Sequence, residues 1–496
     1  MSAHTGSTPK AIVAPRTIEN FVGGRWLAAS SDEAVADLNP ADPSDVLAHV
    51  PLSAPADVTR AIAAAADAFP AWRETSPIRR GQTLLRAARI LEERADELAR
   101  LLTREQGKTL AESRGELPRA IGFWGWIGHQ GGGIQGITAP TEADRILGLT
   151  LREPLGVVGL ITPWNFPVNI PSWKLGSALV CGNTVVLKPA QVTPLVANAL
   201  IEVLDEAGVP PGVVNIVHGS GSVVGQALVD DPRVKAISFT GSTAVGMDIN
   251  VRAARHGKRV QAELGGHNAV VVLADADLER AAQGCVAAAY GTTGQRCTAP
   301  RRIVVVRAVA EELVDRLAAG TRAVTTGPGD RDDVDIGPLI DERARDEVSG
   351  QIQRALDEGA ELVAQGSSVG DPAGYFVPPT LLRNVDPAMT IARDEVFGPV
   401  LPTLVVEDYD EAMRVATGTR YGLSTSIYTR DLTTAIRFMH DTDSGVVHVN
   451  KPPIGAESHL PFGGLKDSAL GAKELGAAAD FYTQGKTVFL DWSESS

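Results

Sequence analysis

The sequence predicts an α/β fold in which parallel sheets carry helices on both faces. The first observation is its length of 496 residues, too long for one hydrophobic core, because single cores stop growing at about 250–300 residues. The second is that, from about Leu155, short apolar runs alternate with amphipathic ones, which is typical of parallel strands joined by helices. The third is that the chain contains no internal repeat and no low-complexity linker. We therefore expect two or three α/β domains.

The first series of elements runs from residue 156 to residue 241. Strands are expected at 156–164, 183–190, 212–219 and 234–241, and helices at 171–182, 193–208 and 222–231. Gly182 and Gly208 close the first two helices, as glycine does where the chain leaves a helix in a left-handed conformation. Ligands of such sheets bind beyond the carboxyl ends of the strands, so residues that follow these strands are candidates for a site.

A second series follows, together with two segments that fit neither series. Strands are expected at 268–273 and 301–306, and helices at 310–318, 341–358 and 409–417. The exceptions are 131–152 and 480–492, both of which alternate as strands do. We expect them to form a small separate sheet, whose exposed edges favour pairing with another subunit.

Composition excludes several classes of protein. Forty-six Lys and Arg against 60 Asp and Glu give a net charge of −14 and a pI of about 5.2, which disfavours nucleic acid or an anionic membrane as the main partner. Three cysteines without C-x-x-C and nine histidines without H-x-x-x-H indicate neither a disulfide framework nor a metal site. No signal peptide or membrane span is visible, so we expect a cytoplasmic protein in which residues 1–16 form a loose tail.

One cysteine lies in an unusual setting. Cys181 and Cys285 stand among apolar and small residues, where a free thiol is most often a packing residue. Cys297 instead lies in "GTTGQRCTAP", residues 291–300, which favours an open polar loop. A thiol beside Arg296 suits a nucleophile, because a cation favours the thiolate. The competing interpretation is an ordinary packing residue.

Four further motifs follow predicted strands. "FTGSTAVG", residues 239–246, ends a strand and opens a helix, where free N–H groups bind anions. "LKPA", "ITPWNFP" and "ELGGHNA" place Lys188, Asn165 and Glu263 at comparable points. Each has an ordinary alternative: a plain turn, a surface lysine, a turn-stabilising amide or a solvated carboxylate. Their combination and order carry the argument.

Taken together, "ITPWNFP", "LKPA", "FTGS", "ELGG", "GQRCTA", "EVFGPV" and "PFGGLKDS" resemble the aldehyde dehydrogenase superfamily, from about Ile18 to Asp491. The resemblance implies the fold of that family, with a Rossmann-like cofactor domain, an α/β catalytic domain and a small β oligomerisation segment. It assigns residues 17–130 and 153–263 to the dinucleotide-binding domain, 264–465 to the catalytic domain, and 131–152 with 478–496 to the oligomerisation (bridging) segments.

The resemblance also implies roles for single residues. Cys297 is similar to the family's nucleophile, Glu263 to its general base, and Asn165 to the side chain that completes its oxyanion hole. Glu474 matches an acidic residue on the proton path. The implied cofactor is NAD or NADP, and the residues implied to bind it are Ile161, Thr162, Pro163, Trp164, Lys188, Gln191, Gly221, Phe239, Gly241, Ser242, Leu264, Glu395 and Phe397. Those implied to line the substrate site are Phe166, Trp173, Arg296, Thr298 and Phe462.

Departures from the family pattern bear on specificity. Gln191 stands where NAD-strict members carry Glu, whose charge repels a 2′-phosphate, so we predict use of NADP alongside NAD. His267 replaces a more frequent Lys, and "SALGAKELG" lacks a Gly and an Arg. The ending "NKPPIGAESHLPFGGLKDSALGAKELGAAADFYTQGKTVF" is similar to the subgroup that oxidises 2-oxoglutarate semialdehyde. An acidic substrate also agrees with Arg296, because a guanidinium binds a carboxylate in bidentate fashion; the alternative is a structural contact in the loop.

Other functions stay open at this point. The substrate alternatives are succinic semialdehyde, betaine aldehyde or an alkyl aldehyde. The rival classes are a CoA-acylating dehydrogenase, a non-catalytic binding protein on this fold, and a cysteine hydrolase with a His base. We expect a homodimer or homotetramer that acts on a small aldehyde.

Overall fold

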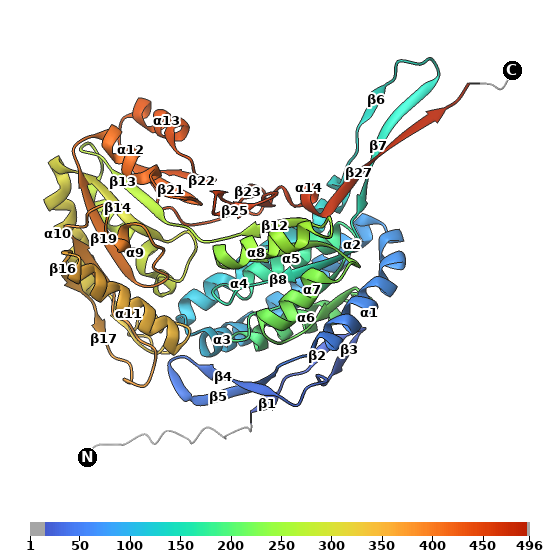
Figure 1. Cartoon of the computed structure of the whole chain (residues 1–496), viewed down its shortest axis with the longest axis horizontal. Helices are drawn as coiled ribbons and strands as arrows, with labels where there is room; N and C mark the ends of the chain where they lie inside the picture. Colours follow the sequence, from blue (N-terminus) through green and yellow to red (C-terminus); the bar gives the residue numbers. More distant parts are fainter. Residues whose placement is uncertain (1–14, 494–496) are drawn as a thin grey trace.

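The computed structural model describes residues 15–493, which form two helix-covered sheets and a projecting arm (Figure 1). A small N-terminal sheet has the order β1-β5-β4. Its strands are β1 (Arg16–Thr17), β4 (Ala34–Asn39) and β5 (Asp42–Pro51). Of the predicted tail 1–16, residues 1–14 lie outside the described residues. Arg16 pairs with Ala48 of β5, so the predicted boundary is one residue too late.

The first large sheet has eight strands in the order β25-β12-β11-β8-β9-β10-β2-β3. The five from β12 to β10 are parallel, and an antiparallel strand flanks them on each side. Their bounds are β2 (Asn20–Val22), β3 (Arg25–Leu27), β8 (Val157–Ile161), β9 (Thr184–Lys188), β10 (Val214–Ile216), β11 (Val234–Thr240), β12 (Arg259–Glu263) and β25 (Ala469–Leu470). The predicted parallel sheet is confirmed for all four strands of the first series.

Alternation along the strands gives this sheet two buried faces. Val158 and Leu160 of β8 belong to one apolar core, and Val157 and Ile161 to the other. The first core is closed by α2 (Pro77–Glu93), α3 (Ala95–Gln106), α4 (Leu110–His129), α5 (Asn169–Val180) and α6 (Pro194–Glu206). The second is closed by α1 (Pro55–Glu74), the π-helical turn η2 (Gly221–Gly225), α7 (Gln226–Asp230) and α8 (Thr243–Ala254). The predicted helices are confirmed, although the third begins with a π-helical turn.

The second large sheet has seven strands in the order β16-β18-β19-β14-β13-β21-β22, all parallel except β16. Their bounds are β13 (Asn268–Val272), β14 (Pro300–Val306), β16 (Glu361–Gln365), β18 (Thr380–Arg383), β19 (Val400–Val406), β21 (Ser424–Tyr428) and β22 (Val446–Val449). The covering helices are α9 (Leu278–Tyr290), α10 (Arg307–Ala323), α11 (Glu342–Asp357), α12 (Tyr409–Thr417) and α13 (Leu432–Asp441). The helix predicted at 310–318 is longer, because Leu313, Leu317 and Thr321 continue its buried stripe.

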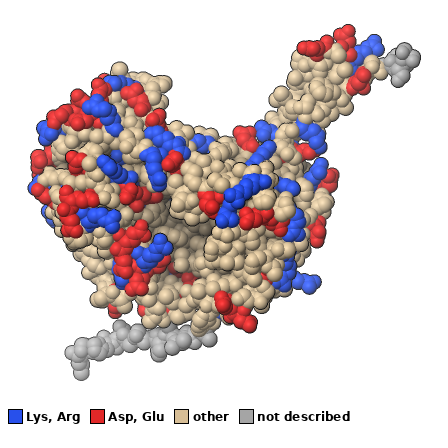
Figure 2. All heavy atoms as spheres, viewed as in Figure 1, with Lys and Arg blue, Asp and Glu red and all other residues tan. Residues whose placement is uncertain are grey.

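Short elements connect these layers. They are the 3-10 turns η1 (Gln130–Gly133), η3 (Gly291–Gly294) and η4 (Thr390–Ala392), the strand pairs β15 (Thr325–Thr326) with β17 (Ser367–Ser368), β20 (Tyr421–Gly422) with β24 (Leu465–Lys466), and β23 (Pro461–Phe462) with β26 (Glu474–Leu475), and the helix α14 (Ala478–Tyr482). The surface is hollowed between the two sheet-bearing halves, and acidic and basic side chains alternate around them (Figure 2).

The arm is a three-stranded sheet of order β27-β7-β6 that projects from the body (Figure 1). Its strands are β6 (Thr138–Pro140), β7 (Ile146–Pro154) and β27 (Thr483–Asp491), so the small separate sheet predicted from both segments is confirmed. The prediction is wrong for 480–482, which end α14. Phe481 and Tyr482 are buried in the first core, and this burial outweighs the strand-like alternation.

Within residues 15–493 no helix combines the length and apolarity needed to cross a bilayer. The same residues contain no group of three or more His, Cys, Asp or Glu side chains arranged to hold a metal ion. Cys181 and Cys285 are buried, as predicted, and burial raises the pKa of each thiol to about 12.

Two buried carboxyl groups face each other between β4 and α3. Glu105 accepts hydrogen bonds from the backbone N–H groups of Leu195 (2.5 Å) and Val196 (3.0 Å), at the start of α6. Burial raises the pKa of Asp37 to about 7, against a smaller lowering by Glu105. Burial and the charge of Asp37 raise the pKa of Glu105 well above its usual range. The pair therefore keeps a proton that the unfolded chain releases near pH 4.

This proton makes stability depend on pH. Between the unfolded carboxyl's pKa and about 7, the folded state binds more protons than the unfolded state, so stability falls as pH rises. Asp37→Asn carries no such proton. We therefore expect the melting temperature of Asp37→Asn minus that of the wild type to be several degrees higher at pH 8 than at pH 5. Circular dichroism measures both melting temperatures. The exposed Asp32→Asn is the matched control, and parallel curves for wild type and Asp37→Asn would refute the linkage.

Candidate active site

The two large sheets meet where the chain crosses from one to the other. β12 ends at Glu263 and β13 begins at Asn268, so residues 264–267 join the carboxyl edge of the first sheet to the amino edge of the second. Cys297 lies at that amino edge, in the loop between α9 and β14. The side-chain amide of Asn268 donates to the carbonyl oxygens of Cys297 (2.7 Å) and Ala299 (2.9 Å). The crossing segment therefore holds the cysteine backbone directly.

A strained turn precedes the cysteine. Thr292 and Thr293 adopt left-handed conformations, with φ of 53° and 56°, which cost about 1–2 kcal/mol each for residues with a Cβ. Glu112 accepts the Thr292 backbone N–H at 2.5 Å, and the Thr293 hydroxyl donates to the Gly337 carbonyl at 2.9 Å. Gly294 continues the left-handed run so close to the Gly398 carbonyl that a Cβ would collide with it. The turn is thus fixed by its surroundings rather than by its own preference.

Arg301 also stabilises this turn. This buried guanidinium donates to the carbonyl oxygens of Gly294 and Arg296, each at 2.8 Å. It also lies 5.3 Å from the centre of the Phe397 ring. One cation therefore joins the cysteine turn to the loop that carries Phe397.

Asn165 lies beside the cysteine loop. It is buried, and its amide nitrogen donates to the Gln295 carbonyl oxygen at 2.9 Å, two residues before Cys297. Its side-chain oxygen has no hydrogen-bond partner among residues 15–493. The loop after β8 thus brings an amide N–H donor to the immediate neighbourhood of the thiol, although 132 residues (297 − 165) separate the two in sequence.

Glu263 is the last residue of β12, in the first large sheet. One of its carboxylate oxygens accepts the Gly464 N–H at 3.2 Å, and the other is buried without a hydrogen-bond partner in the part of the chain that the structure describes. Burial, together with the charge of Glu474, raises the pKa of Glu263 well above its usual range, against smaller lowering by Gly464, Lys473 and Lys174. A carboxyl group with a raised pKa binds a proton more strongly than an exposed one does and is a stronger base once that proton has left.

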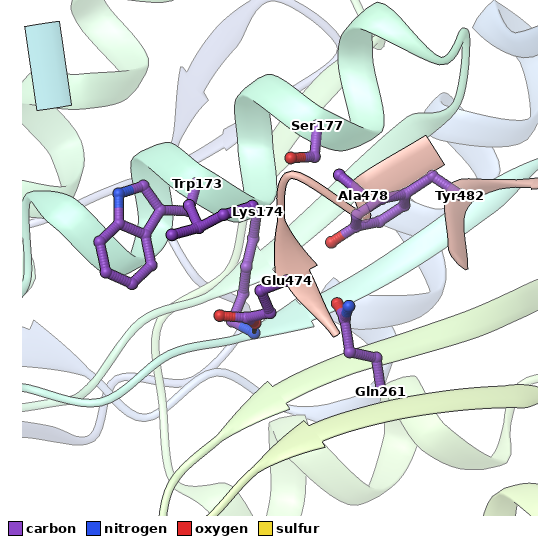
Figure 3. A pocket seen from close by; sticks show the side chains of 8 residues that line it. Trp173, Lys174, Ser177, Gln261, Glu474, Ala478 and Tyr482 are labelled. Atoms are coloured by element: carbon purple, nitrogen blue, oxygen red, sulfur yellow. Dashed lines mark hydrogen bonds and ion pairs between the residues drawn. The ribbon is translucent and has the colours of Figure 1, made fainter. Parts of the chain in front are cut away.

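Glu474 belongs to a buried polar network (Figure 3), and its charge acts on Glu263. Lys174 donates to Glu474 at 2.5 Å and to the Ser238 hydroxyl at 2.8 Å, and Ser238 donates to Gln261 at 2.9 Å. The network borders a cavity of about 10 Å³ that Ser177 and Tyr482 also line. A polar cavity of this size holds one water molecule.

The predicted cofactor residues gather along the carboxyl edge of the eight-stranded sheet. Ile161 and Lys188 pair in register at the ends of β8 and β9, as do Thr240 and Glu263 at the ends of β11 and β12. After β8 come Thr162, Pro163 and Trp164, and after β9 comes Gln191. The junction of β11 and α8 contains Phe239, Gly241 and Ser242. Gly221 is the first residue of η2, and Leu264 follows β12. Glu395 accepts the Gly266 N–H at 3.2 Å, and the Trp164 and Phe397 rings meet edge to face at 5.7 Å.

This edge suits a ligand with hydroxyl and phosphate groups. The buried Lys188 ammonium has one hydrogen-bond acceptor, the Pro189 carbonyl oxygen at 2.8 Å, out of the three that an ammonium can use. Burial lowers its pKa to about 8. The Thr162 hydroxyl is also buried and has no hydrogen-bond partner within the described residues. These unused polar groups fit a dinucleotide.

The thiol itself is less open than the sequence suggested. Cys297 is partly buried and packs against the first core. Burial raises its pKa to about 12, Glu395 and Glu263 add to the rise, and Arg301 lowers it. The Arg296 guanidinium and the thiolate attract each other, but burial outweighs this attraction, so the net shift of the Cys297 pKa is upward. The Arg296 guanidinium also donates to the Thr292 hydroxyl at 3.0 Å and lies 3.5 Å from Glu112.

The predicted substrate residues lie on the same side as Asn165. Trp173 and Phe462 pack with ring centres 5.9 Å apart, and the Arg296 guanidinium lies 5.8 Å from the Phe166 ring centre. Thr298 is buried next to the thiol. The Phe166 ring and the Arg296 guanidinium thus lie where the loops that carry Asn165 and Cys297 meet.

Sequence reasoning missed several residues of the site. Asn268 lies in "ELGGHNA" and Arg301 directly follows "GTTGQRCTAP", but neither residue is among the predicted site residues. Lys108, Glu112 and Glu116 lie in helix α4 or just before it, about 180 residues from the cysteine. Their only local signal is a capping box, with Thr109 and Glu112 bonded to each other, which indicates a helix start and no function.

Comparison with known proteins places this geometry in context. A model of the aldehyde dehydrogenase family matches residues 26–488. The chain is 41 % identical to an α-ketoglutaric semialdehyde dehydrogenase of Bacillus subtilis, over 97 % of this chain and 99 % of that protein. It is 39 % identical to a malonate-semialdehyde dehydrogenase of Halalkalibacterium halodurans, over 96 % and 98 %. The crystal structure of an NADP-dependent enzyme of E. coli superposes with a TM-score of 0.92 at 36 % identity, covering 95 % and 98 %.

The raised pKa of Cys297 gives a direct test. We expect alkylation by iodoacetamide to be slow at pH 7 and to rise steeply with pH, because only the thiolate reacts. Of the two carboxylates that raise the Cys297 pKa, Glu395 has the larger effect. Glu395→Gln removes that charge, so the midpoint of the rate-against-pH curve should fall by about half a pH unit or more. The measurement is modification rate against pH by mass spectrometry, with the exposed Glu407→Gln as control. An unchanged midpoint in Glu395→Gln would contradict the electrostatic account.

Proposed function

The chain belongs to the aldehyde dehydrogenase family, and from this premise we propose that Cys297 attacks a short carboxylated aldehyde, of the 2-oxoglutarate semialdehyde type, which leaves as the acid. As a family member it is an NAD(P)-dependent aldehyde dehydrogenase. The observation that carries the proposal is the convergence of three groups from separate elements: the Cys297 thiol, the Asn165 amide and the unpartnered oxygen of Glu263.

The first step forms a carbon–sulfur bond. The thiol must lose its proton before it attacks, and the free oxygen of Glu263 is suited to take it. Negative charge then develops on the aldehyde oxygen. The Asn165 amide and the Cys297 backbone N–H are the proposed donors to it, and losing one such donor typically costs about 2.7–4 kcal/mol of barrier.

When bound, NAD(P) accepts the hydride that leaves the aldehyde carbon, and a thioester on Cys297 remains. We propose that Lys188 and the β11–α8 turn hold the cofactor, with Glu395 and Phe397 at its nicotinamide end. The carboxyl edge described above supports this assignment through its free hydrogen-bonding groups.

Hydrolysis of the thioester completes the cycle. Once Glu263 has passed on the proton it took from the thiol, it takes a proton from water, and the hydroxide equivalent adds to the thioester carbon and releases the carboxylic acid and the Cys297 thiolate. Glu263 must then lose that proton. The Glu474–Lys174 pair and its water-sized cavity support a route away from the site.

The proposed substrate carries a carboxylate because Arg296 lies next to the nucleophile and because of the relative named for α-ketoglutaric semialdehyde. Glu112 is one acceptor for Arg296, but a guanidinium has five N–H donors, so donors remain for a substrate carboxylate. The relative named for malonate semialdehyde favours a second candidate, a shorter semialdehyde acid.

We further propose the domain division 17–130 with 153–263, 264–465, and 131–152 with 478–496, the last as the contact between subunits of a homodimer or homotetramer. The separate sheets support the division. The arm supports the contact because it exposes large apolar side chains: Ile137, Leu147, Leu151, Phe489, Leu490 and Trp492. Exposed apolar patches of this kind mark association surfaces.

NADP use is tested at Gln191. A neutral amide does not repel a 2′-phosphate, so we expect kcat/KM with NADP within a factor of about ten of that with NAD. Gln191→Glu should lower kcat/KM for NADP by about tenfold or more and leave NAD within about threefold. Initial rates at 340 nm with both cofactors measure this. A hundredfold preference of the wild type for NAD would sink the argument.

The substrate class is tested with a panel of 2-oxoglutarate, succinic and malonate semialdehydes, betaine aldehyde and a neutral alkyl aldehyde. Arg296→Ala should raise KM about tenfold or more for the acids, as expected for one charge-assisted hydrogen bond, and less than about twofold for the neutral aldehyde. Arg114→Ala, an exposed arginine of α4, is the control. Equal effects on both classes would remove Arg296 as the carboxylate-binding residue. Product analysis with and without CoA separates hydrolysis from acylation of CoA.

A further inference from the structure

Helix α4 presents two carboxylates one turn apart. Glu112 and Glu116 are separated by four residues, so both lie on the same face of the helix. α4 packs beside α5, whose first residues follow the Asn165 loop (Figure 1). Glu116 is buried and Glu112 is partly buried. Neither residue touches the thiol, yet each binds one of the two loops that meet at it.

Glu116 holds the Asn165 loop. One of its oxygens accepts the backbone N–H groups of Val168 and Asn169, each at 3.0 Å, at the start of α5. The other accepts the Lys108 ammonium at 2.6 Å. Lys108 in turn donates to the Asn165 carbonyl oxygen at 2.8 Å and lies 4.3 Å from the Phe166 ring centre. The loop is therefore gripped at both of its ends.

Glu112 holds the Cys297 loop. Its first oxygen accepts the Thr292 N–H at 2.5 Å and lies 3.5 Å from the Arg296 guanidinium. Its second accepts the Thr109 backbone N–H at 3.2 Å, which caps α4 itself. The carboxylate thus ties the strained left-handed turn to the first turn of a rigid helix.

We propose that Glu112 and Glu116 are positioning residues that use α4 as a spacer between the two oxyanion donors, the Asn165 amide and the Cys297 N–H. The two loops come from different sheets. They meet through the hydrogen bond from the Asn165 amide to the Gln295 carbonyl and through the Arg296 guanidinium, 5.8 Å from the Phe166 ring centre. The Asn165 amide has two N–H donors, one of them used in that bond, so the separation of the loops determines where the second one points. Through Glu116 and Glu112, α4 holds both loops. The inference rests on the proposed role of Asn165.

A double-mutant cycle tests the Glu116 half. Glu116→Gln should lower kcat about tenfold with KM within about twofold, since a misplacement of 1 Å can cost a hundredfold. In an Asn165→Ala background the same change should cost less than about twofold, because the donor it positions is gone. Iodoacetamide alkylation of Cys297, which needs no oxyanion hole, should stay within about twofold of wild type in Glu116→Gln. A purely structural lesion would change both rates. The exposed Glu93→Ala of α2 is the control.

The Glu112 half is tested separately, so that a folding failure of the buried Glu116 variant leaves the proposal open to refutation. Glu112→Ala should lower kcat about tenfold, whereas Glu112→Gln, which keeps an acceptor for the Thr292 N–H, should stay within about threefold of wild type. Equal losses in both variants, or a full Glu116→Gln effect in the Asn165→Ala background, would overturn the inference. Full activity of Asn165→Ala alone would instead overturn the proposed function.

Discussion

The strained turn before Cys297 is the constraint on which the rest of the site depends. Thr292 and Thr293 adopt left-handed backbone conformations that neither residue favours, and such strain persists only where the surroundings determine it. Here Glu112 comes from α4, Gly337 from a distant loop, and Arg301 from β14. The turn sets the direction in which the Cys297 N–H and thiol leave the second sheet. Every other proposed group is placed relative to that direction.

Burial favours the neutral, protonated forms of the acidic groups in the site. Cys297, Glu263 and Glu395 all have pKa values raised by burial, and the two carboxyl groups also act on the thiol. The three charges would repel one another in a medium of low polarity, so the site favours proton retention until a ligand changes the balance. The same burial that slows the free thiol protects it from adventitious oxidation and alkylation. We therefore expect the free thiol to react slowly with such reagents at neutral pH.

The parallel sheets follow from local pattern, and so do the positions of several proposed site residues at strand ends. Strand ends at Ile161, Lys188 and Glu263 could be located because apolar runs stop there and polar residues begin. The charge environment of Cys297 could not be located in this way. The neighbour in sequence, Arg296, pairs with Glu112, and a second cation, Arg301, four residues after Cys297, also lowers the pKa of the thiol. Distance along the chain does not report which side chains face one another across a turn, and nothing near Glu112 marks its contact with Thr292.

The acidic surface and the proposed anionic ligands are compatible because different distances govern them. Surface charges are screened over about 8 Å at physiological ionic strength, so the net charge of −14 acts weakly inside the site. What matters there is how each buried cation is compensated. Glu116 pairs with Lys108, Glu112 with Arg296, and the charge of Glu395 acts on Arg301. Among these cations Lys188 differs, since its hydrogen-bond partner in residues 15–493 is a neutral carbonyl. An anionic cofactor therefore meets an uncompensated cation at the sheet edge, whereas an anionic substrate must compete with Glu112 for Arg296. The structure thus favours strong binding at the cofactor edge and discrimination, rather than strength, at the substrate end.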